Sequence, residues 1–168
     1  MNPMNAVRDM RTIKVLLTDA ERIAREMGDK EPGAEHLLLG AIGMPDGAAA
    51  RALGRFEVDA ARLRAAIVRE HADALAAIGI DAATVGGEGG PTPALPVEPP
   101  SRLYRSSPSA QEAFQAAGAK ARSAKQRLSS AHVVLAAADV ERGTLARVLD
   151  ALGVERAALR DAARGELG

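Results

Sequence analysis

The 168-residue chain contains no cysteine, no tryptophan, and only one tyrosine and two phenylalanines. Without cysteine there are no disulfides, no thiolate zinc sites and no cysteine nucleophile. No apolar run approaches the roughly 18 residues that span a bilayer, and the first residues lack the apolar segment of a signal peptide. We therefore expect a cytoplasmic protein.

The chain also lacks a net charge, because 22 lysines and arginines balance 22 aspartates and glutamates. A neutral protein has no general electrostatic attraction to nucleic acid or to anionic membranes. What remains is aliphatic: hydrophobic residues make up 47% of the sequence, whereas aromatics make up 2%. A core of leucine, valine, isoleucine, methionine and alanine suits packed helices better than strands, so we expect an all-α fold.

A break in composition divides the chain into two halves. Residues 86–100 combine a glycine-rich run with five prolines, and such a segment favours neither helix nor strand. The sequence therefore predicts a first unit over residues 1–80, a Gly/Pro-rich linker over 81–106 and a second unit over 107–168. The glycine run has no Lys-Ser/Thr pair after it, as a phosphate-binding loop requires, so we expect no nucleotide and no other cofactor.

The two halves repeat each other at an offset of 96 residues. At this offset His36 matches His132, Gly47 matches Gly143, and no gap is needed between them. Apolar spacing and capping residues predict four helices in each half. In the first half these cover about residues 10–27, 34–42, 47–56 and 59 onward, and in the second half about 107–124, 130–138, 143–152 and 155 onward.

The first copy carries the run Gly33-Ala34-Glu35-His36-Leu37-Leu38-Leu39-Gly40, followed by Gly47, Leu53 and Val58-Asp59. This pattern resembles the Clp amino-terminal repeat, which occurs in pairs at the front of Clp ATPases such as ClpA, ClpB and ClpC. The second copy is more degenerate but stays in register. The resemblance implies two four-helix repeats related by a pseudo-twofold axis. It also implies a non-catalytic module that binds substrates or adaptors of a Clp protease. Since the chain has no ATP-binding motif, it resembles a stand-alone relative of that front domain.

The resemblance also implies a ligand site. In the ClpC branch, each repeat has an acidic site that can bind phosphorylated arginine. Glu35 stands at the relevant position in the first copy but Ala131 in the second, so an arginine-type ligand is expected at the first repeat only. The alternative is that Glu35 faces solvent and only complements the dipole of its helix. Tyr104 is a candidate substitute for the aromatic residue that the family often places before its second repeat. We expect structural roles for the two repeated histidines and the two repeated glycines.

Two other functions stay open at this stage. Hydrophobic cyclic peptides are known to dock on ClpC-type front domains, so a free-standing copy would sequester such molecules. The basic run Lys120–Arg127 points instead to a DNA-associated regulator, although neutral net charge and the lack of interleaved aromatics argue against it.

Catalysis and metal binding find no support in the sequence. No local motif supports a Ser-His-acid arrangement, and the three histidines lack the paired spacing of metal ligands. We therefore expect neither an enzyme nor a metal site. Arg51 and Arg147 occupy equivalent positions, and we expect them to face solvent or to form ion pairs within their own repeats, with contact to an acidic partner as the alternative.

Overall fold

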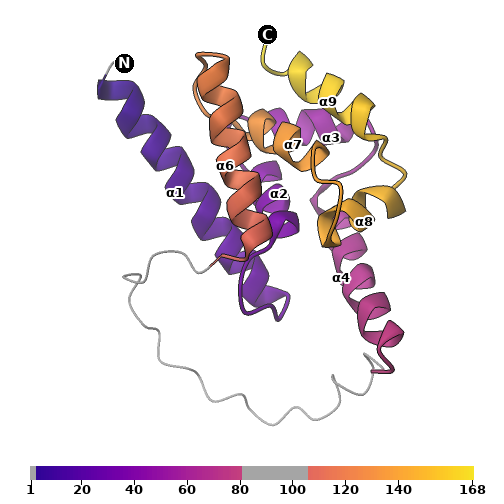
Figure 1. The fold of residues 1–168 in the computed structure, drawn as a ribbon. Helices are drawn as coiled ribbons and strands as arrows, with labels where there is room; N and C mark the ends of the chain where they lie inside the picture. Colours follow the sequence, from indigo (N-terminus) through magenta and orange to yellow (C-terminus); the bar gives the residue numbers. More distant parts are fainter. Residues whose placement is uncertain (1–2, 81–105) are drawn as a thin grey trace, which may run out of the picture.

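The computed structural model describes residues 3–80 and 106–168, and within these ranges it contains eight helices and no strand. The first half contributes α1 (Pro3–Glu26), α2 (Ala34–Ile42), α3 (Ala48–Gly54) and α4 (Ala60–Ala77), and the second half contributes α6 (Pro108–Ser123), α7 (Ser130–Ala138), α8 (Thr144–Ala151) and α9 (Arg156–Gly165) (Figure 1). The predicted all-α fold is confirmed. Apart from Ser106, the predicted linker lies outside the described residues. None of the helices described is both long and apolar enough to cross a membrane.

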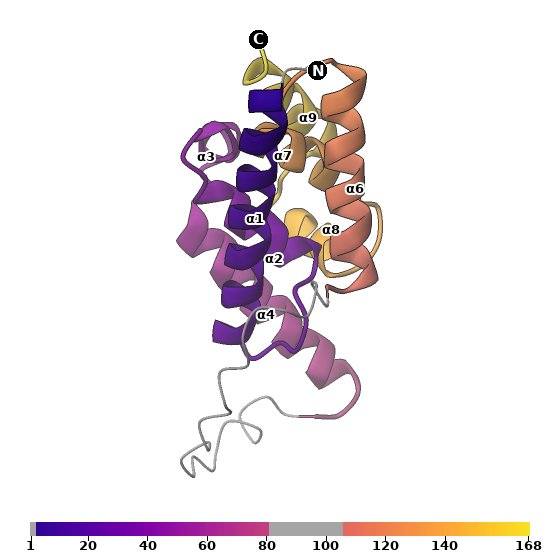
Figure 2. The ribbon, with the colours of Figure 1, turned by 90° about the vertical axis from the view of Figure 1, so that its left-hand side faces the viewer.

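The short helices α2 and α7 form the centre of the molecule. Eight of the nine residues of α2 and all nine residues of α7 are buried. Beyond their polar first turns, both helices are apolar on every side, which is the pattern of a helix enclosed by its neighbours. They pack against each other, and α1 and α6 cover the face of this pair that Figure 2 presents to the viewer. The centre of the fold is therefore built equally from both halves.

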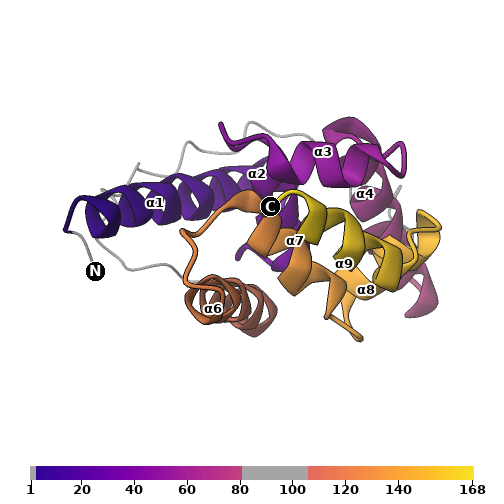
Figure 3. The ribbon, with the colours of Figure 1, turned by 90° about the horizontal axis from the view of Figure 1, so that it is seen from above.

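The remaining helices cross from one half to the other. Helix α3 packs against α7 and α9, and α4 packs against α8 (Figure 3). One hydrophobic cluster includes residues of both halves, among them Leu53 of α3 and Leu149 of α8. The two repeats thus share a single core. The unit boundaries expected at residues 80 and 107 remain a prediction about the sequence repeat.

The helix starts support the predicted duplication. Helices α3 and α8 both follow a glycine with a positive φ angle, 64° at Gly47 and 90° at Gly143. Helices α4 and α9 both begin after an acidic cap, Asp59 and Glu155, whose carboxylates accept backbone N–H groups of the first turn. Glycine is favoured where φ is positive, because a side chain is strained there.

The first helix differs in part from its predicted apolar stripe. Leu16, Ala20, Ile23 and Ala24 are buried as expected, whereas Met10 is 66% exposed. The amino-terminal end of α1 extends beyond the helices that cover the rest of it (Figure 3). The apolar spacing of this segment therefore predicts the helix correctly, but fewer of its apolar residues are buried than the spacing indicates.

Glu57 adopts a left-handed conformation with φ of 57°, and the equivalent residue of the second half is Gly153 with φ of 70°. Because this conformation strains a residue with a side chain, we expect Glu57→Gly to raise the free energy of unfolding by about 0.5–1 kcal/mol. The matched change Gly153→Ala should lower it by a similar amount. Urea denaturation of the three proteins measures both effects, and a destabilised Glu57→Gly variant would contradict the assignment of strain.

Candidate functional site

Glu35 lies in the first turn of α2 and is only 7% exposed. Its side chain folds back over Gly33, so that a methyl group on that glycine would overlap the carboxylate. Oε1 lies 3.5 Å from Nδ1 of His36. The sequence places a carboxylate here, and the missing side chain at position 33 gives that carboxylate its space.

The side chain of His36 caps the amino end of the same helix. The Gly33 N–H donates a hydrogen bond to Nδ1 at 2.9 Å, which leaves the ring proton on Nε2, 3.1 Å from Oδ2 of Asp29. The ring is 1% exposed, and this burial lowers the pKa of His36 although Glu35 and Asp29 act in the opposite direction. His36 is therefore neutral at pH 7 and does not compensate the charge of Glu35.

The start of α6 lies against the start of α2. Ser109 Oγ accepts the Ala34 N–H at 3.3 Å, and the Ser107 N–H donates to the carbonyl of Pro32 at 3.0 Å. The two serine hydroxyls also lie 2.9 Å from each other. Glu35 is thus close to a polar junction that the amino ends of two helices build, one from each half of the chain.

Across residues 9–80 and 106–168, no lysine or arginine lies within ion-pair distance of Glu35. A carboxylate that is largely removed from water is costly unless hydrogen bonds or a cation compensate it. A guanidinium group is the partner that suits a carboxylate best, because it can form two parallel hydrogen bonds. The arrangement can therefore bind a cation with the geometry of arginine.

Comparison with known proteins identifies the fold family. The family described as the Clp repeat (R) N-terminal domain matches the chain over residues 11–91. Residues 11–91 belong to this family. The crystal structure of the N-terminal domain of the caseinolytic protease associated chaperone ClpD from Arabidopsis thaliana is similar, with a TM-score of 0.58 and 19% identity over 91% of this chain and 90% of that one. Comparison with curated protein sequences gives no match. Clp N-terminal domains are non-catalytic modules that bind substrates and adaptors of Clp ATPases.

The second half of the chain has no counterpart of the acidic site. Ala131, which stands where the first half has Glu35, is fully buried. His132 again accepts the N–H that precedes its helix, that of Ser129 at 3.2 Å, and the Ser129 hydroxyl lies 2.9 Å from the same ring nitrogen. Burial also lowers the pKa of this histidine. The structural role expected for both histidines is supported by these bonds and by their burial.

Asp46 of the first half caps α7 of the second half, a contact that the sequence alone did not suggest. Its Oδ2 accepts the Ser130 N–H at 2.8 Å, and its Oδ1 accepts the Ser130 hydroxyl. The same hydroxyl accepts the Ala49 N–H at 2.8 Å. Asp46 also accepts the Ala48 N–H at 3.2 Å, at the start of α3. This network joins the amino ends of α3 and α7.

His71 is a further member of the first-half cluster that sequence analysis missed. It belongs to α4, its Nδ1 lies 3.6 Å from Oδ2 of Asp29, and its ring centroid is 6.3 Å from that of His36. The packing of α4 brings His71 close to Asp29 and His36, so no local sequence motif predicts this contact. The described part of the chain contains no group of three or more His, Cys, Asp or Glu side chains that could hold a metal ion. Tyr104 lies outside the described residues.

Arg51 and Arg147 form ion pairs between the halves, so the expected pairing within each repeat is wrong for them. Arg51 Nε lies 2.6 Å from Glu166, and Arg147 pairs with Glu70. Glu70 and Glu166 are separated by the same 96 residues as the two arginines. The ion pair is thus duplicated with the repeat. Each copy joins the two halves because α3 packs against α9 and α8 packs against α4.

The basic run at the end of α6 is partly neutralised. Lys120 Nζ lies 2.5 Å from Asp139, and Arg127 Nε lies 3.5 Å from Asp9. A DNA-binding surface needs several uncompensated cations along one face. The structure therefore does not favour the DNA-associated function.

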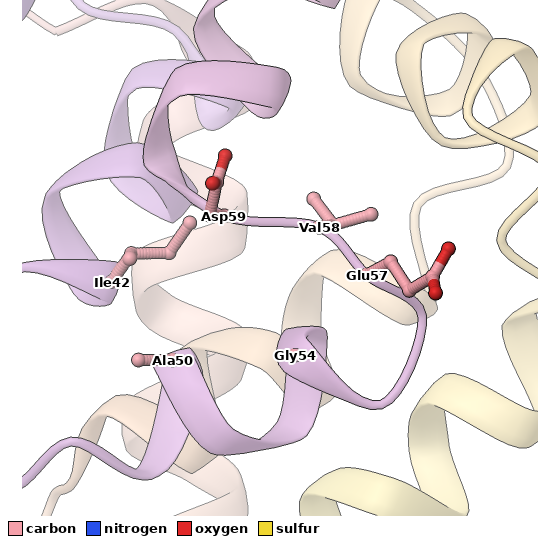
Figure 4. Close-up of a pocket in the computed structure, with 6 residues that line it drawn as sticks. All are labelled: Ile42, Ala50, Gly54, Glu57, Val58 and Asp59. Carbon is pink, nitrogen blue, oxygen red and sulfur yellow. The ribbon is translucent and has the colours of Figure 1, made fainter.

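A small hollow of about 260 Å³ lies between α3 and the start of α4 (Figure 4). It combines apolar Ile42 and Val58 with the carboxylates of Glu57 and Asp59. Asp59 is already used, since it accepts the N–H of Arg62 at 2.8 Å. The two carboxylates do not converge on one point in Figure 4, so this hollow offers no binding geometry comparable to that of Glu35.

The two buried histidines predict how stability depends on pH. The unfolded chain protonates them near the ordinary pKa of 6.5, whereas the folded chain resists protonation until a lower pH. We therefore expect the free energy of unfolding to fall as the pH drops below 6.5, in urea titrations from about pH 8 to about pH 5.

The control is the double variant His36→Gln/His132→Gln. Glutamine at this third helical position can still accept the N–H that precedes the helix, as in a capping box, but it does not titrate. The variant should lose most of the dependence on pH between 6.5 and the lowered pKa values. An unchanged dependence would show that other groups cause it.

Proposed function

We propose that this chain is a non-catalytic recognition module that binds client proteins or adaptors of a Clp ATPase. We further propose that Glu35 binds the guanidinium group of an arginine, or of a phosphoarginine, on those partners. The observation that carries this proposal is a largely buried carboxylate for which the described residues supply no lysine or arginine.

The position of Glu35 favours a charged ligand over a neutral one. The carboxylate is in the first turn of α2, where the helix dipole stabilises negative charge. Neutral His36 leaves it uncompensated. A ligand cation would then replace the water that still reaches the site with two charge-assisted hydrogen bonds.

A phosphoarginine adds a negative group, which needs donors. The hydroxyls of Ser107 and Ser109 lie at the amino end of α6, where the helix dipole favours anions. One hydroxyl proton is used between the two serines, so Glu35 and this pair together provide an acceptor and one donor at the junction. Ala131 provides neither in the second repeat, so we propose one such site per chain.

Calorimetric titration with a peptide that contains a single arginine or phosphoarginine tests this function. We expect one ligand per chain, and Glu35→Gln should weaken binding at least about tenfold because it removes the charge that pairs with the guanidinium. Glu31→Gln makes the same change at an exposed residue four positions away and should bind like the unaltered protein.

Thermal unfolding of both variants checks that the fold is intact. We expect the Tm of Glu35→Gln to stay within a few degrees of that of Glu31→Gln, since glutamine fills the same volume. Two equivalent sites per chain, or unchanged binding by Glu35→Gln, would contradict the proposal. Loss of binding together with a collapse of the Tm would be resolved by Glu35→Asp, which keeps the charge and should retain part of the affinity.

A further inference from the structure

A groove of about 720 Å³ lies between α6, α7 and α9, away from Glu35 and entirely within the second half. Its apolar part comes from Leu135 and from alanines of α6. Its charged part comes from Lys120, Arg160 and Arg164, which we call the basic groove residues, and from the carboxylate of Asp139. The groove thus joins an apolar surface to three cations and one carboxylate.

The single carboxylate is shared between two of the cations. Asp139 Oδ2 lies 2.5 Å from Lys120 Nζ, and Asp139 Oδ1 lies 2.7 Å from Arg160 Nε. Arg164 has only a 3.4 Å contact to Asp161, and both of these side chains are more than 60% exposed. The groove therefore carries more positive charge than Asp139 compensates. The N–H donors of Lys120 and Arg160 already point at a carboxylate, that of Asp139.

The charge of Asp139 persists at neutral pH. Its burial acts to raise the pKa, but hydrogen bonds and charges from Lys120 and Arg160 outweigh that effect and hold the pKa of Asp139 below its ordinary value. Asp139 is therefore an internal anion that occupies the two cations until another anion displaces it.

The fold does not require this arrangement. At the offset of 96 residues, the first-half positions that correspond to the four charged residues of the groove hold Ala24, Gly43, Arg64 and Val68. Arg64 pairs with Glu26 instead, at 3.1 Å. Three of the four charges are thus present in one repeat and absent in the other, although both repeats form the same helices.

We propose that the basic groove residues bind an acidic segment of a partner protein, in which aspartate or glutamate side chains stand next to an apolar side chain. The charge complements such a segment, and Leu135 supplies the apolar contact. The carboxylates of the segment take over the donors of Lys120 and Arg160 that Asp139 now occupies, while Arg164 provides a further pairing group. A nucleic acid fits less well, because a phosphate backbone offers no apolar side chain to Leu135 and the chain has no net charge.

Fluorescence anisotropy with a labelled peptide of alternating glutamate and leucine tests this proposal on the full chain. Lys120→Gln should weaken binding at least about tenfold, since it removes one cation of the groove. Asp139→Asn should instead tighten binding, because it removes the competing internal anion. Arg142→Gln, at an exposed arginine of the same half, should bind like the unaltered protein.

The two variants are expected to change the affinity in opposite directions, so misfolding cannot explain both results. A variant that merely loosens the fold would weaken binding, so tighter binding by Asp139→Asn has no such explanation. Weaker binding by Asp139→Asn, no binding of the acidic peptide, or equal binding of a peptide of alternating lysine and leucine would each overturn the proposal. Tighter binding of a duplex DNA than of the acidic peptide would assign the groove to nucleic acid and overturn it too. Glu35→Gln should leave this binding unchanged.

Discussion

Complete burial of α2 and α7 is the constraint on which the rest of the structure depends. The first N–H groups of a helix have no partner within it, and such a group costs about 1–3 kcal/mol when it is buried without an acceptor. Here His36 and His132 each accept the N–H just before their own helix, and other side chains complete the starts. Among residues 9–80 and 106–168, the buried polar side chains therefore lie only where these two helices begin.

The same constraint explains why functional chemistry collects at the helix starts. Each start draws its remaining acceptor from a distant segment: Ser109 for α2, and Asp46 for α7. The duplicated scaffold can thus hold different polar residues at its two ends without changing its core. The first end has gained the carboxylate of Glu35, and the second has the fully buried Ala131 in the same place. This asymmetry is the physical basis for the single guanidinium site that we propose.

Sequence patterns predicted most of what is local. Helix order, the helix starts near residues 59 and 155, and the structural role of both repeated histidines follow from spacing and short-range effects, which act within a few residues. The ion pair of Arg51 with Glu166 and the approach of His71 to Asp29 depend on how α3 and α4 cross other helices. Nothing in a single sequence specifies those crossings, so these contacts were missed or assigned to the wrong half.

The most direct test of the central claim is native-state hydrogen exchange at the amides of Leu38 in α2 and Val134 in α7, which are both fully buried. If the two helices form one core, both amides exchange only through global unfolding, with free energies equal to each other and to that from urea denaturation. A clearly lower free energy at one of them would show that the halves unfold separately, and would contradict a core shared by both repeats.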